Sequence, residues 1–244
     1  MRRLGLIGNP LGHSFSASWF KAKFQAERIT DALYENYELP SLEDLLLLFE
    51  KHKDLCGLNV TIPYKEQVLP YLDEQSHEVR QIGACNCIHI LEGRSIGYNT
   101  DAYGFRNSLE PLLNAHHKKA LVLGTGGASK AVIYVLNQLG IKQALVSRRP
   151  SDTTISYADV TPEVLQDHLL IINTTPVGTY PIVDEAPPLP YHLLTEQHLL
   201  FDLVYNPPTT KFLALGTDRG AQISNGQRML ELQAEESWRI WNTP

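Results

Sequence analysis

Hydrophobic positions in the first hundred residues alternate between short apolar runs and stripes with helical spacing. Residues 4–7 predict a strand, and the stripe over 16–27 predicts a helix that Ser16 would cap. Further strands are predicted at 34–39, 56–62 and 84–91, and a second helix at 41–52. Because alternating strands and helices build helix-covered sheets, we expect an α/β unit with a mostly parallel sheet.

A second unit with the same alternation is predicted from about residue 103 onward. Its apolar runs predict strands at 120–123, 144–146, 169–172, 199–204 and 222–224. A long amphipathic helix from 225 to about 241 is then left without a strand to follow it. We expect this helix to return to the first unit. The predicted domains are therefore 1–101 plus 225–244, and 102–224, with a cleft between them.

Charge and cysteine content narrow the possible classes of protein. The 21 basic and 27 acidic residues give a formal net charge of −6, which argues against a protein that coats nucleic acid or anionic lipid. No apolar run approaches the roughly 20 residues of a membrane span. Three cysteines suit a reducing cytoplasm, and we expect Cys85 and Cys87 to pack in a strand rather than bind a metal.

A glycine-rich turn in the second unit indicates a dinucleotide site. Gly124-x-Gly126-x-x-Ser129 follows a predicted strand and opens a predicted helix, where backbone N–H groups bind a pyrophosphate. An NAD site calls for an acidic residue about 20 positions on. The sequence there reads Ser147-Arg148-Arg149, and guanidinium groups suit a 2′-phosphate. These residues predict NADP(H) as cofactor, with its 2′-phosphate on Arg148 and Arg149.

Polar residues in the first unit cluster after the predicted strands, where ligands of open α/β sheets bind. They include Lys65 and Asp101 with several Ser, Thr and Asn side chains, a set that suits a small polyhydroxylated acid. Gln233 shares a helical face with apolar residues and needs a partner, which a ligand hydroxyl or the backbone could supply.

Eight segments that span Gly8 to Ala234 resemble the shikimate dehydrogenase family, in the family's order. They read GNPLGHSFS, NVTIPYKE, GACN, GYNTDAYGF, GTGGAS, NTTPVG, DLVYNP and NGQRMLELQA. The resemblance implies a substrate domain that the last helix completes and an inserted Rossmann-like NADP-binding domain. The reaction it implies is the reversible NADPH-dependent reduction of 3-dehydroshikimate to shikimate, in chorismate and aromatic amino-acid biosynthesis.

The resemblance also implies roles for individual residues. Lys65 and Asp101 would be catalytic. Substrate would be bound by Ser14, Ser16, Asn59, Thr61, Asn86, Tyr205 and Gln233. The cofactor would be bound by Gly124, Gly126, Gly127, Ala128, Ser147, Arg148, Arg149 and Thr174. Cys87 stands where the family commonly has Thr, and Ser147 and Arg149 depart from its usual Asn-Arg-Thr.

The chemistry of a ketone reduction agrees with the Lys65–Asp101 pair. Hydride delivery builds negative charge on the ketone oxygen, and a cation or proton donor lowers the barrier. Both roles remain open for Lys65. Two alternatives are a quinate/shikimate dehydrogenase that uses NAD, which would favour an acidic residue near Ser147, and a non-catalytic NADP-binding sensor, which would lack Lys65 or Asp101. We expect a cytoplasmic monomer or homodimer without a membrane or nucleic-acid partner.

Overall fold

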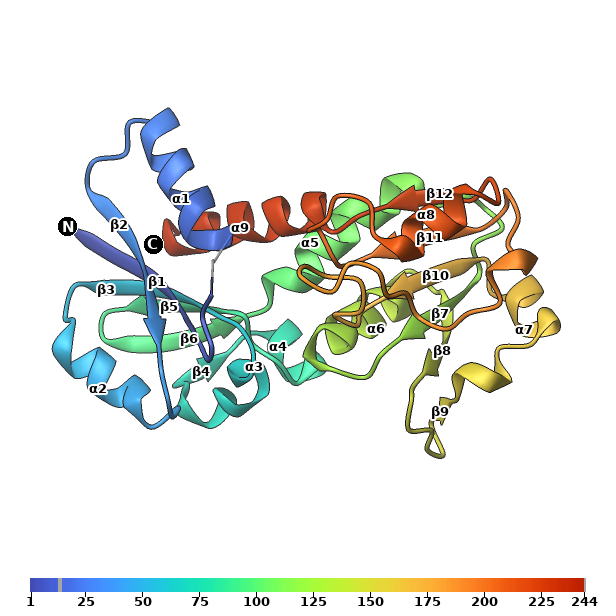
Figure 1. The fold of residues 1–244 in the computed structure, drawn as a ribbon. Helices are drawn as coiled ribbons and strands as arrows, with labels where there is room; N and C mark the ends of the chain where they lie inside the picture. Colours follow the sequence, from blue (N-terminus) through green and yellow to red (C-terminus); the bar gives the residue numbers. More distant parts are fainter. Residues whose placement is uncertain (13–14, 244) are drawn as a thin grey trace. The chain divides into compact units, whose positions relative to one another are not determined.

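The structure, a computed structural model, describes residues 1–12 and 15–243 and divides into two compact units (Figure 1). The first is Met1–Tyr103 with Gln233–Pro244, and the second is Gly104–Leu232. The second division falls inside the last helix, α9 (Gln227–Trp241). The boundaries predicted from the sequence, after residues 101 and 224, precede the corresponding divisions at Tyr103 and Leu232.

The first unit contains a six-stranded sheet in the order β2-β1-β3-β5-β6-β4. Its strands are β1 (Arg2–Gly8), β2 (Ala32–Glu38), β3 (Leu55–Val60), β4 (Glu74–Gln75), β5 (Cys87–Leu91) and β6 (Arg94–Tyr98). The sheet is mixed: of the five strand pairings among the described residues, three are parallel, as expected, but β5 pairs antiparallel with both β3 and β6. Glu92 and Gly93, both at positive φ, form the two-residue turn that joins β5 to β6 as a hairpin.

The helices of the first unit include α1 (Phe15–Ala26), α2 (Asp44–Lys51), α3 (Tyr64–Gln67) and α4 (His77–Ile82). Ser16 does not cap α1, because Phe15 before it is already helical. The second helix begins later than expected, at Asp44. The residues before it form a turn, in which the N–H of Asp44 donates to the carbonyl of Ser41 over 3.3 Å.

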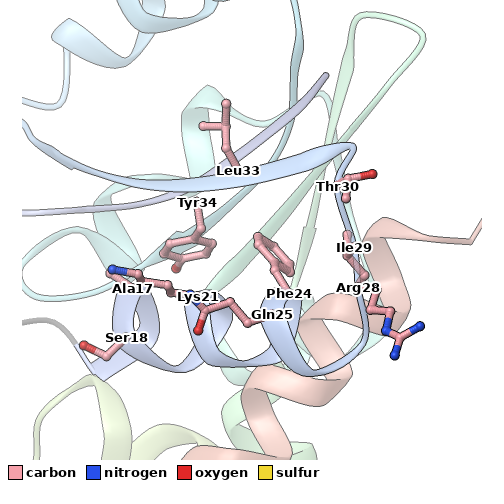
Figure 2. A pocket seen from close by; sticks show the side chains of 10 residues that line it. All are labelled: Ala17, Ser18, Lys21, Phe24, Gln25, Arg28, Ile29, Thr30, Leu33 and Tyr34. Atoms are coloured by element: carbon pink, nitrogen blue, oxygen red, sulfur yellow. The ribbon is translucent and has the colours of Figure 1, made fainter.

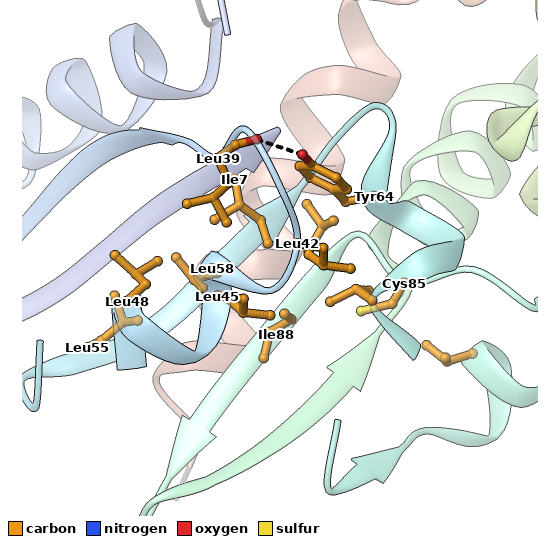
Figure 3. Close-up of a cluster of buried hydrophobic side chains, with 13 residues drawn as sticks. Ile7, Leu39, Leu42, Leu45, Leu48, Leu55, Leu58, Tyr64, Cys85 and Ile88 are labelled. Atoms are coloured by element: carbon orange, nitrogen blue, oxygen red, sulfur yellow. Dashed lines mark hydrogen bonds between the residues drawn. The ribbon is translucent and has the colours of Figure 1, made fainter. Parts of the chain in front are cut away.

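Two hydrophobic clusters cover the faces of this sheet. One joins α2 and α3 to the sheet and is anchored by Tyr64, whose hydroxyl donates to the carbonyl of Leu39 over 2.6 Å (Figure 3). The other includes Phe20 of α1 and Trp241 of α9. Cys85 lies in the first cluster and Cys87 in the second. Alternate residues of one strand would share a face, but Cys85 precedes β5 and the chain bends at Asn86 between the two cysteines, so only Cys87 packs in a strand as expected.

Both cysteine side chains are buried, and the Cys85 thiol donates to the carbonyl of Cys87 over 3.3 Å. Burial raises the pKa of the Cys85 thiol to about 12 and raises that of Cys87 as well. Within residues 1–12 and 15–243, no group of three or more His, Cys, Asp or Glu side chains could hold a metal ion. In the same residues no helix is both long and apolar enough to cross a bilayer.

The second unit is a doubly wound α/β structure. Its strands are β7 (Lys119–Leu123), β8 (Lys142–Val146), β9 (Thr154–Ile155), β10 (Leu170–Asn173), β11 (Leu199–Asp202) and β12 (Gln222–Ser224). They pair in parallel in the order β12-β11-β10-β7-β8-β9. The chain runs outward from β7 in one direction and from β10 in the other, so ligands are expected where these two strands end.

The remaining helices are α5 (Thr100–Leu109), α6 (Gly127–Gln138), α7 (Pro162–Asp167) and α8 (Lys211–Thr217). The core of the second unit is built around β10 and β11, which are fully buried, and β7, which is buried from Ala120 onward, with Phe212 of α8 packed into it. Helix α5 starts at Thr100 because Asn99 caps it, accepting the N–H of Ala102 over 3.0 Å.

Candidate functional site

Lys65 and Asp101 form an ion pair in the first unit. Lys65 lies in the short helix α3, and Asp101 in the first turn of α5, which Asn99 orients. The Lys65 Nζ is 2.7 Å from the Asp101 Oδ2, and their side chains are 20% and 11% exposed. The pair is thus largely shielded from solvent while one edge stays reachable, as a group that acts on a bound molecule requires.

Two buried asparagines, Asn59 and Asn86, belong to a network of hydrogen bonds in the same unit. Asn59, at the end of β3, donates from Nδ2 to the carbonyl of Asn86 over 3.3 Å. Asn86 accepts the backbone N–H of Thr100 on its Oδ1 over 2.6 Å and donates from Nδ2 to the Thr100 hydroxyl over 3.0 Å. Thr100 and Asp101 both lie in the first turn of α5, so the amide network and the ion pair meet at the start of this helix.

Helix α9 supplies two more members of this network. The Thr100 hydroxyl lies 3.4 Å from Oε1 of Gln233 and 3.2 Å from Oγ of Ser237. Ser237 also accepts from Nδ2 of Asn59 over 2.9 Å. Gln233 is buried with the rest of this apolar helix face, and the side chain of Thr100 is close to it. The sequence pattern pointed to Gln233, but it did not point to Thr100 or Ser237.

Tyr34 links the network to the surface. Its hydroxyl donates to Oδ1 of Asn59 over 2.8 Å and hydrogen-bonds with Ser16, and its ring stacks on Phe20 at 4.4 Å. The same ring lines an open cavity of about 720 Å³ between α1 and β2 (Figure 2). Neither Lys65 nor Asp101 lines that cavity. We therefore do not take it as the candidate catalytic site, although it is large.

Three further residues were predicted to bind substrate. Thr61 follows β3 and is half-buried. Its backbone N–H donates to the carbonyl of Ile7 over 2.9 Å. Ser14 lies outside the described residues. Tyr205 belongs to the second unit, where it is half-buried, and burial raises the pKa of its phenol.

The glycine turn of the second unit has the geometry of an anion-binding loop. Gly124 follows β7 at φ +104°, and a Cβ there would lie 2.9 Å from Oγ1 of Thr174. A residue with a side chain is therefore excluded on both conformational and steric grounds. Gly126 precedes α6, whose first residues are Gly127 and Ala128, and the first N–H groups of a helix have no partner within the helix and can bind an anion.

A cavity of about 540 Å³ joins the turn to the predicted phosphate-binding residues. Gly124, Gly126, Ser147, Arg148 and Thr174 all line it. The residue after Arg148 does not line it, although both arginines are exposed. The structure thus brings together five of the eight residues predicted to bind the cofactor and sets the start of α6 beside them.

Residues 180–190 form a proline-rich loop, and part of this loop forms a wall of the cavity. The sequence alone indicated no role for it. Several residues between Thr179 and Pro188 line the cavity together with Tyr157. The loop is held in place because the Tyr191 hydroxyl donates to the carbonyl of Pro187 over 2.7 Å. The position of this loop directly after the NTTPVG segment was the only signal in the sequence; Tyr157 carried none.

A buried polar cluster stands behind the cavity. Asp202 accepts from Asn173 over 3.0 Å and from the Thr210 hydroxyl over 2.5 Å, and burial raises the pKa of its carboxyl to about 6. Asn173 in turn accepts the backbone N–H and the hydroxyl of Thr175, which lines the cavity. This cluster therefore holds the turn after β10 in shape.

Comparisons with known proteins agree over nearly the whole chain. A family model described as the shikimate dehydrogenase substrate binding domain matches residues 6–88. The shikimate dehydrogenase (NADP(+)) of Caldicellulosiruptor saccharolyticus is 36% identical over 99% of this chain and 92% of its own length.

Two solved structures show the same similarity in three dimensions. Shikimate 5-dehydrogenase of Thermus thermophilus in complex with NADP(H) and shikimate is 33% identical, covers 99% of this chain and 94% of its own, and superposes with a TM-score of 0.87. Quinate dehydrogenase from Corynebacterium glutamicum in complex with NAD is 28% identical with a TM-score of 0.87, over 99% and 93% of the two chains. The resemblance seen in the sequence is confirmed, and the chain belongs to the shikimate dehydrogenase family.

Proposed function

We propose that this protein reduces 3-dehydroshikimate reversibly to shikimate with NADPH. The observation that carries the proposal is the shielded Lys65–Asp101 ion pair at the edge of a buried set of amide and hydroxyl groups. A non-catalytic sensor would have no need of this pair. Membership of the family and the NADP(+)-dependent relatives support the same reaction.

The chain's own residues would divide the work as follows. Lys65 would face the carbonyl oxygen of the substrate and supply positive charge or a proton as negative charge develops there. Asp101 would hold the ammonium group in place through the 2.7 Å contact. Asn59, Thr61, Asn86 and Gln233 would bind the ring hydroxyls.

The residues predicted to bind the carboxylate and the remaining substrate contacts stay proposals. Ser14 and Ser16 would bind the carboxylate, and Tyr205 would lie near it. The described contact of Ser16 with Tyr34 keeps its hydroxyl on the side of the amide network, which supports this role.

The second unit suits NADP(H), which supplies the hydride when it is bound. The open space beside Gly126, where an added Cβ would meet nothing within 4 Å, and the first N–H groups of α6 suit a pyrophosphate. Exposed Arg148 beside Ser147 suits a 2′-phosphate better than a bare ribose, because a guanidinium forms charge-assisted hydrogen bonds with phosphate oxygens. Gly127, Ala128 and Thr174 would complete the site, whereas Arg149, which does not line the cavity, would contribute only a screened charge.

A paired assay tests the proposal. Purified protein is supplied with shikimate or quinate and with NADP⁺ or NAD⁺, and nicotinamide reduction is followed by absorbance. We expect the highest kcat/KM with shikimate and NADP⁺. Preference for quinate and NAD⁺ would favour the activity named for the Corynebacterium neighbour, and binding of both ligands without turnover would favour a sensor.

Location and assembly are further proposals. We propose a cytoplasmic protein, which the three free thiols of Cys56, Cys85 and Cys87 support. Activity in the soluble cell fraction would test the location. Whether the protein is a monomer or a homodimer stays a prediction for sedimentation measurements.

A further inference from the structure

Ser237 occupies the centre of the buried polar network in the first unit. Its side chain is on α9 and is 0% exposed. The hydroxyl donates to the carbonyl of Gln233, one turn earlier, over 2.9 Å. Its oxygen then faces Asn59 at 2.9 Å and Thr100 at 3.2 Å. One hydroxyl group therefore touches three residues of the proposed substrate site or its support.

These contacts fix the amide of Asn59 in one orientation. Its Nδ2 faces the backbone carbonyl of Asn86, which can only accept, so the nitrogen must lie on that side. The second Nδ2 hydrogen goes to Ser237, and the Tyr34 hydroxyl donates to Oδ1. Both amide hydrogens are used, and the capacity that Asn59 keeps for a ligand is on its oxygen, an acceptor.

The amide of Asn86 is fixed in the opposite sense. Its Oδ1 accepts the backbone N–H of Thr100, which can only donate, so the oxygen must lie there. One Nδ2 hydrogen goes to the Thr100 hydroxyl. Among the residues that the structure describes, the other Nδ2 hydrogen has no partner. What Asn86 keeps for a ligand is thus a donor.

We propose that Ser237 is a positioning residue that sets this donor–acceptor pattern through Asn59. The proposal rests on the proposed function, because it assumes that Asn59 and Asn86 bind the substrate's hydroxyl groups. A substrate oxygen that faces Asn59 must donate its hydrogen, and one that faces Asn86 must accept. Without the Ser237 hydroxyl, one N–H of Asn59 loses its partner, and the amide nitrogen keeps only its longer bond, of 3.3 Å, to the carbonyl of Asn86, so the pattern is less firmly held.

The test is the variant Ser237→Ala, with Ser108→Ala as its matched control. Ser108 is a buried helical serine that makes the same bond to the residue one turn earlier, Gly104, over 2.8 Å, and its hydroxyl bonds with carbonyls of its own helix. We expect Ser237→Ala to raise the KM for shikimate about tenfold with kcat changed less than about twofold. Ser108→Ala should keep the wild-type KM for shikimate. Both variants should keep the wild-type KM for NADP⁺.

Substrate analogues distinguish positioning from general damage. Each of two shikimate analogues lacks one of the hydroxyl groups that is not oxidised, and both are assayed with wild type and Ser237→Ala. We expect the penalty of the variant to disappear for the analogue that lacks the hydroxyl facing Asn59 and to persist for the other. If Ser237→Ala does not fold, Ser237→Cys, which keeps the volume but is a weak acceptor, replaces it.

Two results would overturn the proposal. One is an unchanged KM for shikimate in a folded Ser237 variant, and the other is an equal penalty with both analogues. Failure of the proposed function itself would look different, because wild type would then not oxidise shikimate with NADP⁺ at all.

Discussion

The two units of this protein use buried polar side chains in different ways. In the first unit, the buried amides and hydroxyls around Asn59, Asn86 and Ser237 are themselves the proposed binding groups. In the second, the buried cluster of Asn173 and Asp202 stands behind an open cavity whose charged residue, Arg148, is exposed.

This difference follows from what each ligand demands. A small polyhydroxylated ring offers only directional hydrogen bonds, and these discriminate best when their partners are fixed and shielded from water. A dinucleotide phosphate offers charge, which backbone N–H groups and an exposed guanidinium can bind without burial. We therefore expect substitutions at the first site to act strongly on turnover or KM, and those around the second cavity to act on stability or on cofactor preference.

The largest expected effect is that of Lys65→Ala. Loss of the charge or proton donor at the developing oxyanion should lower kcat by about 10³-fold or more, at the upper end of what one acid–base group contributes. NADPH affinity, measured by fluorescence titration, should remain near that of wild type. The matched control is Lys21→Ala, an exposed lysine of the same unit that forms no ion pair with any of the described residues.

A variant Lys65→Ala with near wild-type kcat would remove this lysine from the mechanism. It would also remove the basis for treating the first unit as the catalytic one. Asp101→Asn sharpens the result, because it keeps the shape of the partner while it removes the charge that holds the ammonium group.

A smaller effect, on stability, should separate the buried cluster of the second unit from that of the first. Burial raises the pKa of Asp202 to about 6 in the folded protein, against 3.8 as its ordinary value. Between these values the folded state binds more protons than the unfolded state, so the contribution of Asp202 to the free energy of unfolding falls as pH rises from about 4 to 6. Below about pH 4 the carboxyl is protonated in both states and nothing is lost.

The measurement compares urea unfolding of wild type and Asp202→Asn across this pH range. Wild type should lose up to about 3 kcal/mol relative to the variant between about pH 4 and pH 6, from the roughly 1.36 kcal/mol that each pKa unit represents. Asparagine can still accept from Asn173 and donate to Thr210, so its own contribution should not depend on pH. If the free energies of unfolding of wild type and variant changed in parallel with pH, burial would not raise the pKa of Asp202.

The sequence was sufficient for the architecture and for the residues whose chemistry is distinctive. Alternating apolar segments predicted the α/β fold, and the Gly124 turn was found because a strand and a helix flank it. The antiparallel hairpin was missed, although Glu92-Gly93 between two apolar runs is a turn signal. Ser237 and Thr100 were missed for a physical reason. A hydroxyl on a helix is common, and only the packing of α9 and α5 around Asn59 and Asn86 gives these two a role.

The cofactor cavity offers the smallest and most graded prediction, because it concerns two neighbouring arginines. Both are exposed, but only Arg148 lines the cavity, whereas the backbone N–H of Arg149 turns toward the Ser147 hydroxyl over 3.2 Å. Arg148→Ala should raise the KM for NADPH by roughly 10- to 100-fold, the range of a lost charge-assisted hydrogen bond, and change that for NADH little. Arg149→Ala should change the KM for NADPH about twofold or less, since an exposed charge outside the cavity is screened by salt.

The ratio of the KM for NADPH to the KM for NADH is measured for each variant at low and at high ionic strength. This ratio distinguishes a bound 2′-phosphate from a general electrostatic attraction of anions. A bound 2′-phosphate predicts that the selectivity for NADPH over NADH is lost only in Arg148→Ala. Equal losses in both variants, or an equal rise of KM for NADPH and NADH in Arg148→Ala, would mean that the arginines merely attract anions to an open surface. In that case the contrast between a fixed substrate site and a charge-selected cofactor site would not hold, because nothing in the second unit would read the difference between the two nicotinamides.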